Sequence, residues 1–236
     1  MNMWVNTKKR TNVVEIMDDF SIHGSILHHT LDTLASINKW LGGNKITINS
    51  LKKILGGHSK KEPITIVDLG CGGGDLLRRI AAYGKEEGYR FKLIGVDANK
   101  DAVLYARHLS EKNNNISFVA CDIFSDEFET LEYDLVLSTL FLHHFKEEQI
   151  ISLLKKLKTK ATLGIIVNDL HRSLIAYYLF KLVSLPINNK MIIEDGLTSV
   201  LRGFKRNELE LFSNKLLVKP QIKWKWAFRY QWIIQN

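Results

Sequence analysis

Residues 64–79 read Ile-Thr-Ile-Val-Asp-Leu-Gly-Cys-Gly-Gly-Gly-Asp-Leu-Leu-Arg-Arg, and this stretch decides the fold. Its first apolar residues are β-branched and lead directly into Asp68, which is typical of a short strand buried on both faces of a parallel sheet. The glycines that follow let the backbone turn sharply and leave no side chain between it and a ligand. An apolar stripe at helical spacing begins at Leu76. The stretch therefore predicts a strand, a bare turn and a helix N-terminus, the unit that cradles nucleotides in a doubly wound sheet.

An acidic residue follows at the distance that such a unit requires. Residues 91–96 form a second strand-like run that ends at Asp97, 23 residues after Gly74. This is close to the offset at which a carboxylate meets the hydroxyls of a ribose. Asp97 could instead cap the next helix, but Asn99 can already do so. We therefore expect Asp97 to bind a ribose.

These residues resemble the first motif of class I S-adenosylmethionine-dependent methyltransferases, in particular the small-molecule type that acts on quinones and polyketides. That motif reads acidic-x-Gly-x-Gly-x-Gly, as Asp68 to Gly74 does, whereas dinucleotide dehydrogenases have Gly-x-Gly-x-x-Gly, which fails at Asp75. Two further stretches resemble the family in order. Residues 118–124 contain the acid expected to meet the adenine amino group, and residues 133–145 resemble the fourth strand and its turn. The resemblance covers residues 63–167 and does not specify the substrate.

The resemblance implies an α/β fold, a doubly wound Rossmann-like sheet of seven strands that is mostly parallel with the last strand antiparallel. It implies a helical lid over residues 1–60 and a methyltransferase domain over residues 61–236, with a substrate-pocket insertion at about residues 171–207. The cofactor would be S-adenosyl-L-methionine and the product S-adenosyl-L-homocysteine. The residues expected to contact the cofactor are Asp68, Gly70, Cys71, Gly72, Gly74, Asp97, Ala98, Asp122, Ile123 and Ser138.

Apolar spacing predicts the elements around this core. It predicts a helix over residues 13–40 that ends at two glycines, a shorter helix near 51–55, and helices near 75–87, 99–113 and 146–158 between strands. Residues 216–224 and 226–234 alternate as two antiparallel strands. The helices before the first strand could cover the site or merely support the sheet, and the insertion could form the acceptor pocket or a core helix.

Composition limits the class of protein. A chain of 236 residues forms one domain, and its two cysteines make no disulfide or metal pattern, so we expect a reduced cytoplasmic setting. The first ten residues are polar and resemble no secretory signal. The most apolar run, residues 174–187, contains Lys181 and Pro186 and falls short of the ~20 residues of a membrane span.

The net charge of +8 is concentrated at the ends of the chain. Residues 1–62 hold nine basic against five acidic residues, residues 63–199 hold sixteen against eighteen, and residues 200–236 hold eight against two. No dense basic run accompanies this excess, so we favour a solvated surface and regard nucleic acid as a disfavoured partner. Attraction to an anionic substrate, a membrane surface or an acidic carrier stays open.

The candidate catalytic residues are histidines in the turn after the fourth strand. His143 and His144 stand where small-molecule methyltransferases carry a similar turn, and imidazole can remove a hydroxyl proton. A packing role is the alternative. We expect no metal, because neighbouring histidines on a helix point about 100° apart. The residues after the fifth strand point weakly to a small aromatic or polyketide-like acceptor, methylated on oxygen or carbon. The candidate substrate residues are His171, Tyr177 and Tyr178.

Two other functions compete with this hypothesis. An enzyme acting on RNA or protein would use the basic ends of the chain. Alternatively, the sheet could bind the cofactor or a partner without catalysis.

Overall fold

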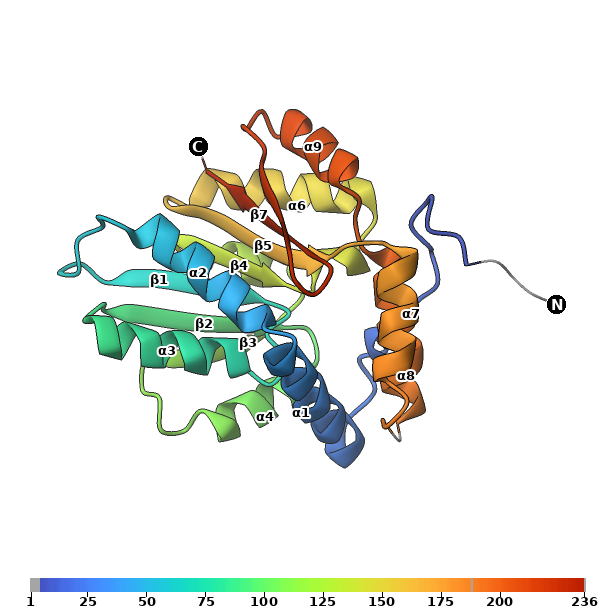
Figure 1. Ribbon diagram of the computed structural model, residues 1–236. Helices are drawn as coiled ribbons and strands as arrows, with labels where there is room; N and C mark the ends of the chain where they lie inside the picture. Colours follow the sequence, from blue (N-terminus) through green and yellow to red (C-terminus); the bar gives the residue numbers. More distant parts are fainter. Residues whose placement is uncertain (1–4, 188, 236) are drawn as a thin grey trace.

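The computed structural model describes residues 5–187 and 189–235, so residues 1–4 of the predicted lid and residue 188 of the predicted insertion lie outside the described residues. Within that part the chain forms a seven-stranded sheet in the order β3-β2-β1-β4-β5-β7-β6 (Figure 1). The strands are β1 (Ile64–Leu69), β2 (Phe91–Asp97), β3 (Ile116–Ala120), β4 (Leu135–Thr139), β5 (Gly164–Leu170), β6 (Gln221–Lys225) and β7 (Arg229–Ile234).

Strands β1 to β5 are parallel, and β7 runs antiparallel to both β5 and β6. The predicted doubly wound sheet is therefore confirmed. The two final strands are shorter than expected, because residues 216–220, which follow helix α9 (Arg206–Lys215), form a turn and coil, and residues 226–228 form the hairpin turn.

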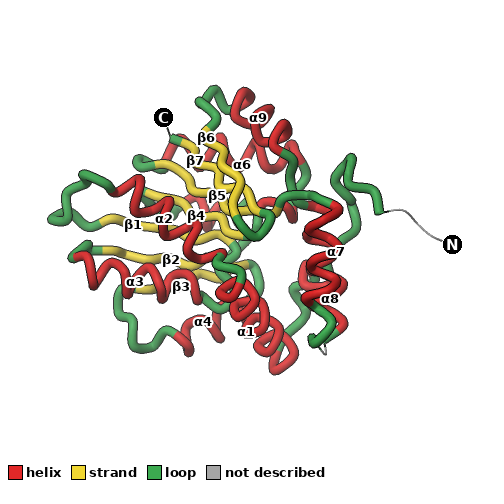
Figure 2. The backbone as a smooth tube through the Cα atoms, in the orientation of Figure 1, coloured by secondary structure: helices red, strands yellow, loops and turns green. Residues whose placement is uncertain are grey.

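Helices cover both faces of the sheet (Figure 2). One apolar core lies between the sheet and helices α2 (Gly43–Leu55), α3 (Asp75–Glu87) and α4 (Lys100–Leu109). The other lies between the sheet and α5 (Asp126–Glu129), α6 (Glu147–Lys160) and α9. The inner strands β1, β2, β4, β5 and β7 are nearly continuous runs of buried residues because each of their faces meets one of these helical layers, whereas the edge strands β3 and β6 are more exposed.

The remaining elements gather at the carboxyl ends of the parallel strands. They are the 3₁₀ helices η1 (Ile16–Asp18) and η2 (Leu142–His144) and the helices α1 (Gly24–Trp40), α7 (Leu174–Val183) and α8 (Lys190–Arg202) (Figure 1). No helix in the described part of the chain combines the length and apolar character needed to cross a bilayer.

The N-terminal helix begins later than predicted. Residues 13–23 are not α-helical, because Asp19 accepts the backbone N–H of Ser21 and polar side chains tie this stretch to other elements. The short predicted helix is longer than expected, since α2 starts directly at Gly43.

Candidate functional site

The glycine turn after β1 adopts a backbone that side chains would strain. Gly70, Gly72 and Gly74 all have positive φ, of 64°, 48° and 72°. A Cβ at Gly70 would lie 2.2 Å from the ring of Phe141, so a larger residue has no room there. Gly74 is also the residue from which α3 begins. The turn therefore presents bare backbone at the N-terminal end of a helix, as the sequence predicted.

Asp97 lies at the end of β2 beside this turn. Its Oδ2 accepts the backbone N–H of Gly72 at 3.0 Å, and its Oδ1 accepts that of Asn99 at 2.9 Å. Burial raises the pKa of the Asp97 carboxyl. Asn99 caps α4 by accepting the backbone N–H groups of Asp101 and Ala102, so Asp97 is not needed as the cap. Each carboxylate oxygen keeps lone pairs for a further donor.

The other positions expected to contact the cofactor lie at the carboxyl ends of four neighbouring strands. Asp68 is buried, and burial together with Asp75 and Asp97 raises its pKa well above the usual value. Ser138 is buried on β4, and its Oγ has no hydrogen-bond partner among the described residues. Asp122 is exposed, and its Oδ1 accepts the backbone N–H of Phe124. Cys71 and Ile123 are buried, whereas Ala98 is partly exposed. The sheet order β3-β2-β1-β4 thus gathers these residues along one edge.

Helices α1 and α2 lie over the glycine turn. Leu31 of α1 faces the turn, since a Cβ at Gly72 would lie 3.1 Å from its Cδ2. Asn44 of α2 donates from Nδ2 to Oδ2 of Asp75 at 2.7 Å. The segment before β1 therefore contacts the predicted cofactor edge directly.

His143 belongs to a buried polar cluster. Its Nδ1 lies 2.7 Å from Oδ1 of Asp169, and its backbone N–H donates to the other carboxylate oxygen at 3.3 Å. Its Nε2 lies 3.6 Å from Oε1 of Glu15. All three side chains are at least nine-tenths buried. Burial raises the pKa of Glu15, whereas the charge and hydrogen bond of His143 outweigh burial and lower the pKa of Asp169.

His144 is more exposed and joins the N-terminal segment to α8. Its Nδ1 lies 2.7 Å from Oδ1 of Asp18, and Nη1 of Arg202 lies 2.7 Å from the other oxygen of that carboxylate. Burial of the Asp18 carboxyl raises its pKa, but the interactions with His144 and Arg202 together outweigh burial and lower the pKa. Arg202 also donates from Nε to the backbone carbonyl of His143 at 3.1 Å. The residues around the two histidines thus come from the N-terminus, η2 and α8.

The prediction that no metal binds assumed that His143 and His144 lie on an α-helix and point about 100° apart, and the structure differs from this assumption. They lie on a 3₁₀ turn with ring centroids 4.3 Å apart, and each brings one ligand atom within 4.8 Å of a Glu15 oxygen. Nη1 of Arg202 lies 3.6 Å from the same Glu15 oxygen. The cation beside this carboxylate in the structure is therefore a guanidinium, and we assign no metal to the cluster.

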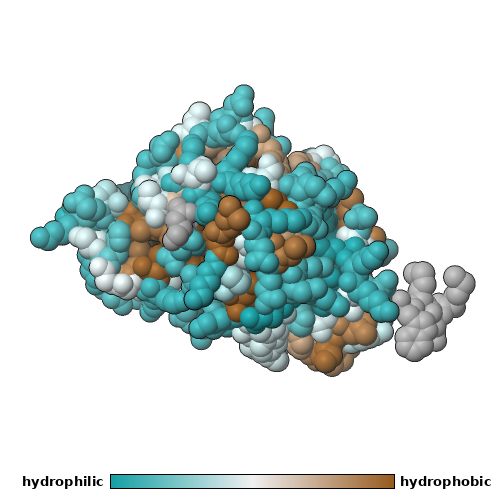
Figure 3. Space-filling model, turned by 90° about the horizontal axis from the view of Figure 1, so that it is seen from above, coloured by the Kyte–Doolittle hydropathy of each residue, from teal (hydrophilic) through white to brown (hydrophobic). Residues whose placement is uncertain are grey.

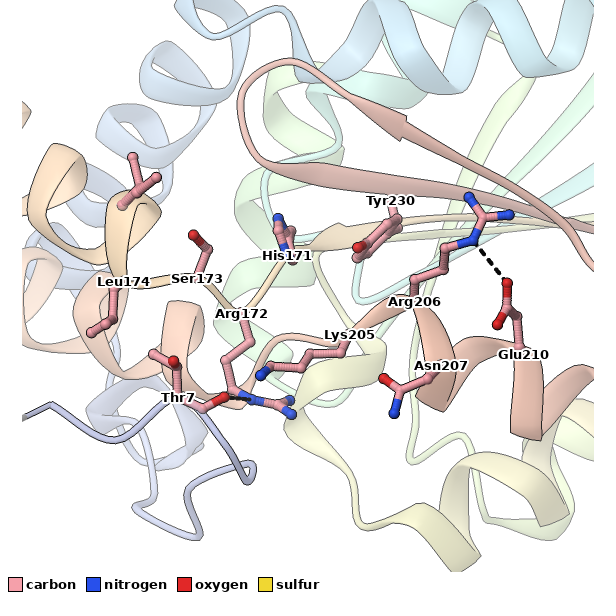
Figure 4. Close-up of a pocket in the computed structure, with 11 residues that line it drawn as sticks. Thr7, His171, Arg172, Ser173, Leu174, Lys205, Arg206, Asn207, Glu210 and Tyr230 are labelled. Atoms are coloured by element: carbon pink, nitrogen blue, oxygen red, sulfur yellow. Dashed lines mark hydrogen bonds and ion pairs between the residues drawn. The ribbon is translucent and has the colours of Figure 1, made fainter.

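The expected acceptor residues are not brought together. His171 lines a cleft of about 700 Å³ between the start of α7, the start of α9 and the β6–β7 hairpin (Figure 4). Its Nδ1 accepts Nε1–H of Trp224 at 3.2 Å. Burial, with Lys205 and Arg172, lowers its pKa. Tyr177 and Tyr178 do not line this cleft.

Sequence reasoning missed four polar residues of this site, and a further buried arginine beside it. Asp169 ends a buried strand, as Asp68 and Asp97 do, and that position is a signal that could have revealed it. Glu15 and Asp18 lie among apolar residues in a stretch predicted to be helical, and Arg202 lies in an ordinary amphipathic helix, so no local pattern marks them. Arg229 of β7 is buried, and its Nε and Nη1 have no hydrogen-bond partner among the described residues.

Comparison with known proteins agrees with this geometry. Residues 66–161 match a family model described as a methyltransferase domain. A protein-lysine N-methyltransferase of Saccharomyces cerevisiae is 32% identical over 93 residues, which are 38% of this chain and 39% of the relative. The ubiquinone biosynthesis O-methyltransferase of Nitrosomonas europaea is 31% identical over 94 residues, 39% of this chain and 36% of the relative. The chain thus spans about two fifths of the length of the curated relatives it matches.

Solved structures match over most of the chain. The plantazolicin methyltransferase BpumL in complex with SAH superimposes with a TM-score of 0.66 at 19% identity, covering 88% of this chain and 90% of that one. The magnesium protoporphyrin IX methyltransferase of Synechocystis PCC 6803 with bound SAH gives a TM-score of 0.54 at 16% identity, covering 82% and 84%.

The domain match lies within this fold, at the part of the chain where the sequence resembles class I S-adenosylmethionine-dependent methyltransferases, and the solved structures share the fold over most of the chain. The methyltransferase domain itself corresponds to β1 through α6, the part of the sheet that contains the glycine turn and Asp97.

Proposed function

We propose that the protein is an enzyme that transfers the methyl group of S-adenosyl-L-methionine to oxygen or carbon of a small aromatic or polyketide-like acceptor. The observation that carries the proposal is the bond between Asp97 and Gly72, because it fixes a carboxylate beside a bare glycine turn. The cofactor supplies a methyl group already activated by its sulfonium. The protein then needs chiefly to align the acceptor and accept a proton. With two free cysteines, it fits a reducing cytoplasm.

The residues present fit this cofactor. Asp97 would accept hydrogen bonds from the ribose hydroxyls, and the exposed Asp122 would accept one from the adenine amino group. The backbone of Gly70 to Gly74 would leave room for the amino acid part beside Asp68. Residues 1–60 would act as a lid, since Leu31 already rests on the turn.

His144 is the stronger candidate for the proton acceptor. About a quarter of its side chain is exposed, whereas His143 is sealed behind Glu15 and bound to Asp169. We therefore assign His143 a positioning role and His144 the contact with the acceptor. His171 would contact the acceptor from its cleft, and the segment 171–207, with Tyr177 and Tyr178, would form the wall of the acceptor site.

A protein acceptor is the second candidate, because one relative of equal similarity is a protein-lysine N-methyltransferase. An assay with a labelled methyl donor distinguishes a small-molecule acceptor from a protein acceptor. Transfer to phenols or polyketides supports the first candidate, whereas label found only in protein lysine supports the second.

Calorimetric titration of S-adenosyl-L-homocysteine tests the cofactor site. We expect micromolar binding that is lost in Asp97→Ala and kept in Asp126→Ala, which removes an exposed carboxylate of α5. Absence of binding to the unaltered protein contradicts the proposal. Equal binding to the Asp97 variant contradicts the role of that residue.

A further inference from the structure

Helix α7 presents an apolar face that no other described element covers. Its sequence is Leu-Ile-Ala-Tyr-Tyr-Leu-Phe-Lys-Leu-Val, and its inner side packs on α8, where the ring of Phe180 leaves no space for a Cβ at Gly196. Apolar residues recur on its outer side at three- and four-residue spacing, as expected of one face of a helix. The exposed residues on it and just beyond its end are Leu174, Ile175, Tyr178, Leu179, Leu182 and Leu185.

The β6–β7 hairpin extends this face with aromatic residues. Trp224 and Trp226 are 46% and 66% exposed. The hairpin is fastened beside the start of α7, because the backbone N–H of His171 donates to the carbonyl of Phe228 at 2.8 Å and Trp224 donates to the His171 ring. We call the exposed apolar residues of α7 and these two tryptophans the α7–hairpin face. In Figure 3 apolar surface gathers at the side of the molecule where α7 lies.

The two chain segments that form this face are basic and contain no acid, although Glu194 and Glu210 lie just outside them and pair with Lys190 and Arg206. No Asp or Glu occurs in residues 170–193 or in residues 211–235, which together hold eight Lys and Arg. Among the described residues Lys181, Lys205, Lys223 and Lys225 form no ion pair. The cleft beside the face has Lys205 and the ion pair of Arg206 with Glu210 at its polar end, and Leu174 and Ile175 at its apolar end (Figure 4).

We propose that the α7–hairpin face docks the protein on an anionic membrane surface. Exposed Leu, Ile, Tyr and Trp surrounded by lysines form the pattern of an interfacial anchor, in which the apolar side chains enter the headgroup boundary and the lysines meet anionic lipid. The docking is independent of the methyl acceptor, and it would let the enzyme take an amphiphilic acceptor from the lipid.

Co-sedimentation of the full chain with vesicles tests the proposal. We expect the protein to pellet with vesicles of phosphatidylcholine and phosphatidylglycerol and to remain in solution with phosphatidylcholine alone. Replacing Ile175 and Leu182 by Asp should lower the partition coefficient by more than tenfold, since each buried side chain contributes about tenfold. The matched control is Leu104→Asp, which alters an exposed apolar residue of α4 and should change nothing.

The same co-sedimentation assay tests how much the lysines contribute to vesicle binding. Lys223→Gln and Lys225→Gln should each lower binding about fivefold, whereas Lys85→Gln on α3 should have no effect. Failure of the unaltered protein to pellet with anionic vesicles at low salt overturns the proposal, as does equal binding to neutral vesicles. A dimer in sedimentation velocity that the Asp variant abolishes, without lipid binding, would assign the face to a second copy of the chain instead. Circular dichroism of each variant establishes that the fold is unchanged.

Discussion

The Asp97 carboxylate at the end of β2 reaches the glycine turn after β1 and accepts the backbone N–H of Gly72 at 3.0 Å. One side chain thus holds the turn in shape and leaves lone pairs free for a ligand. This bond within the protein constrains the turn, and such a constraint lowers the cost of binding a ligand there.

This bond predicts a pH-dependent affinity for S-adenosyl-L-homocysteine. The ionised carboxylate is the better acceptor of ribose hydroxyls, and burial raises the pKa of Asp97. Affinity should therefore fall as the pH is lowered through this raised pKa, starting at a higher pH than for an ordinary Asp. Calorimetry across pH 5–8 measures this, and Asp97→Asn should bind weakly and show no such slope. A parallel slope in the variant would assign the effect to another group.

Asp169→Asn should destabilise the protein at neutral pH. The buried carboxylate is bound to His143, and removing its charge should cost about 1–3 kcal/mol. The folded-state pKa of Asp169 is lowered, so its stabilisation is complete above the pKa of the unfolded chain and is lost as pH falls through the folded pKa. Urea unfolding should show a gap between variant and unaltered protein that closes in acid. A gap that persists in acid would contradict this account, and Asp126→Asn is the control.

Gly88 and Gly70 have similar φ angles but different surroundings. Alanine variants of the two therefore distinguish the cost of backbone strain from the cost of crowding by a neighbouring side chain. Gly88→Ala, at φ 79° with open space around it, should cost only the ~1–2 kcal/mol of left-handed strain. Gly70→Ala, at φ 64°, also places a methyl group against Phe141 and should cost about 1–3 kcal/mol more. Thermal unfolding of the two variants measures the difference. Equal losses would mean that Phe141 moves aside freely.

Two buried arginines should respond in opposite ways to replacement by Met. Arg172 bonds Glu208 and the carbonyl of Thr7, so Arg172→Met should destabilise the fold by several kcal/mol. Burial lowers the pKa of Arg229 to about 10, and two of its nitrogens have no partner among the described residues. Arg229→Met should therefore raise the unfolding free energy by about 1 kcal/mol. Thermal unfolding compares them, and a loss in Arg229→Met would show that its attraction to Asp169 outweighs desolvation.

The sequence predicted the part of the fold that is encoded locally. The glycine turn, the acid after the second strand and the alternating final strands follow from backbone geometry and from side-chain period, so their positions could be read from neighbouring residues. The N-terminal segment could not, because residues 13–23 take their shape from distant partners. Asp195, for example, accepts the backbone N–H groups of Ile16 and Met17 at 2.7 and 2.9 Å.

The same difference between local and long-range contacts explains which residues of the candidate site could be predicted. Asp97 and the glycines belong to one strand-turn-helix unit and its neighbour, whereas the surroundings of His143 come from three separated segments. Glu15, Asp169 and Arg202 lie far from this histidine in the sequence and meet it only in the folded chain, so no local spacing predicts these contacts. Tyr177 and Tyr178 have an aromatic pattern that suits a pocket wall, but no spacing in the chain predicts how much of Tyr178 is exposed on α7.

The position of β7 has a consequence for the order of assembly. β7 lies between β5 and β6, although both precede it in the chain, and β6 pairs with no other strand among the described residues. β5 therefore keeps an open edge until residues 229–234 pair with it, and β6 joins the sheet only through those same residues. Such an edge invites pairing with other chains. We therefore expect nascent chains halted before β7 to aggregate, and full-length chains to close the sheet in a late step.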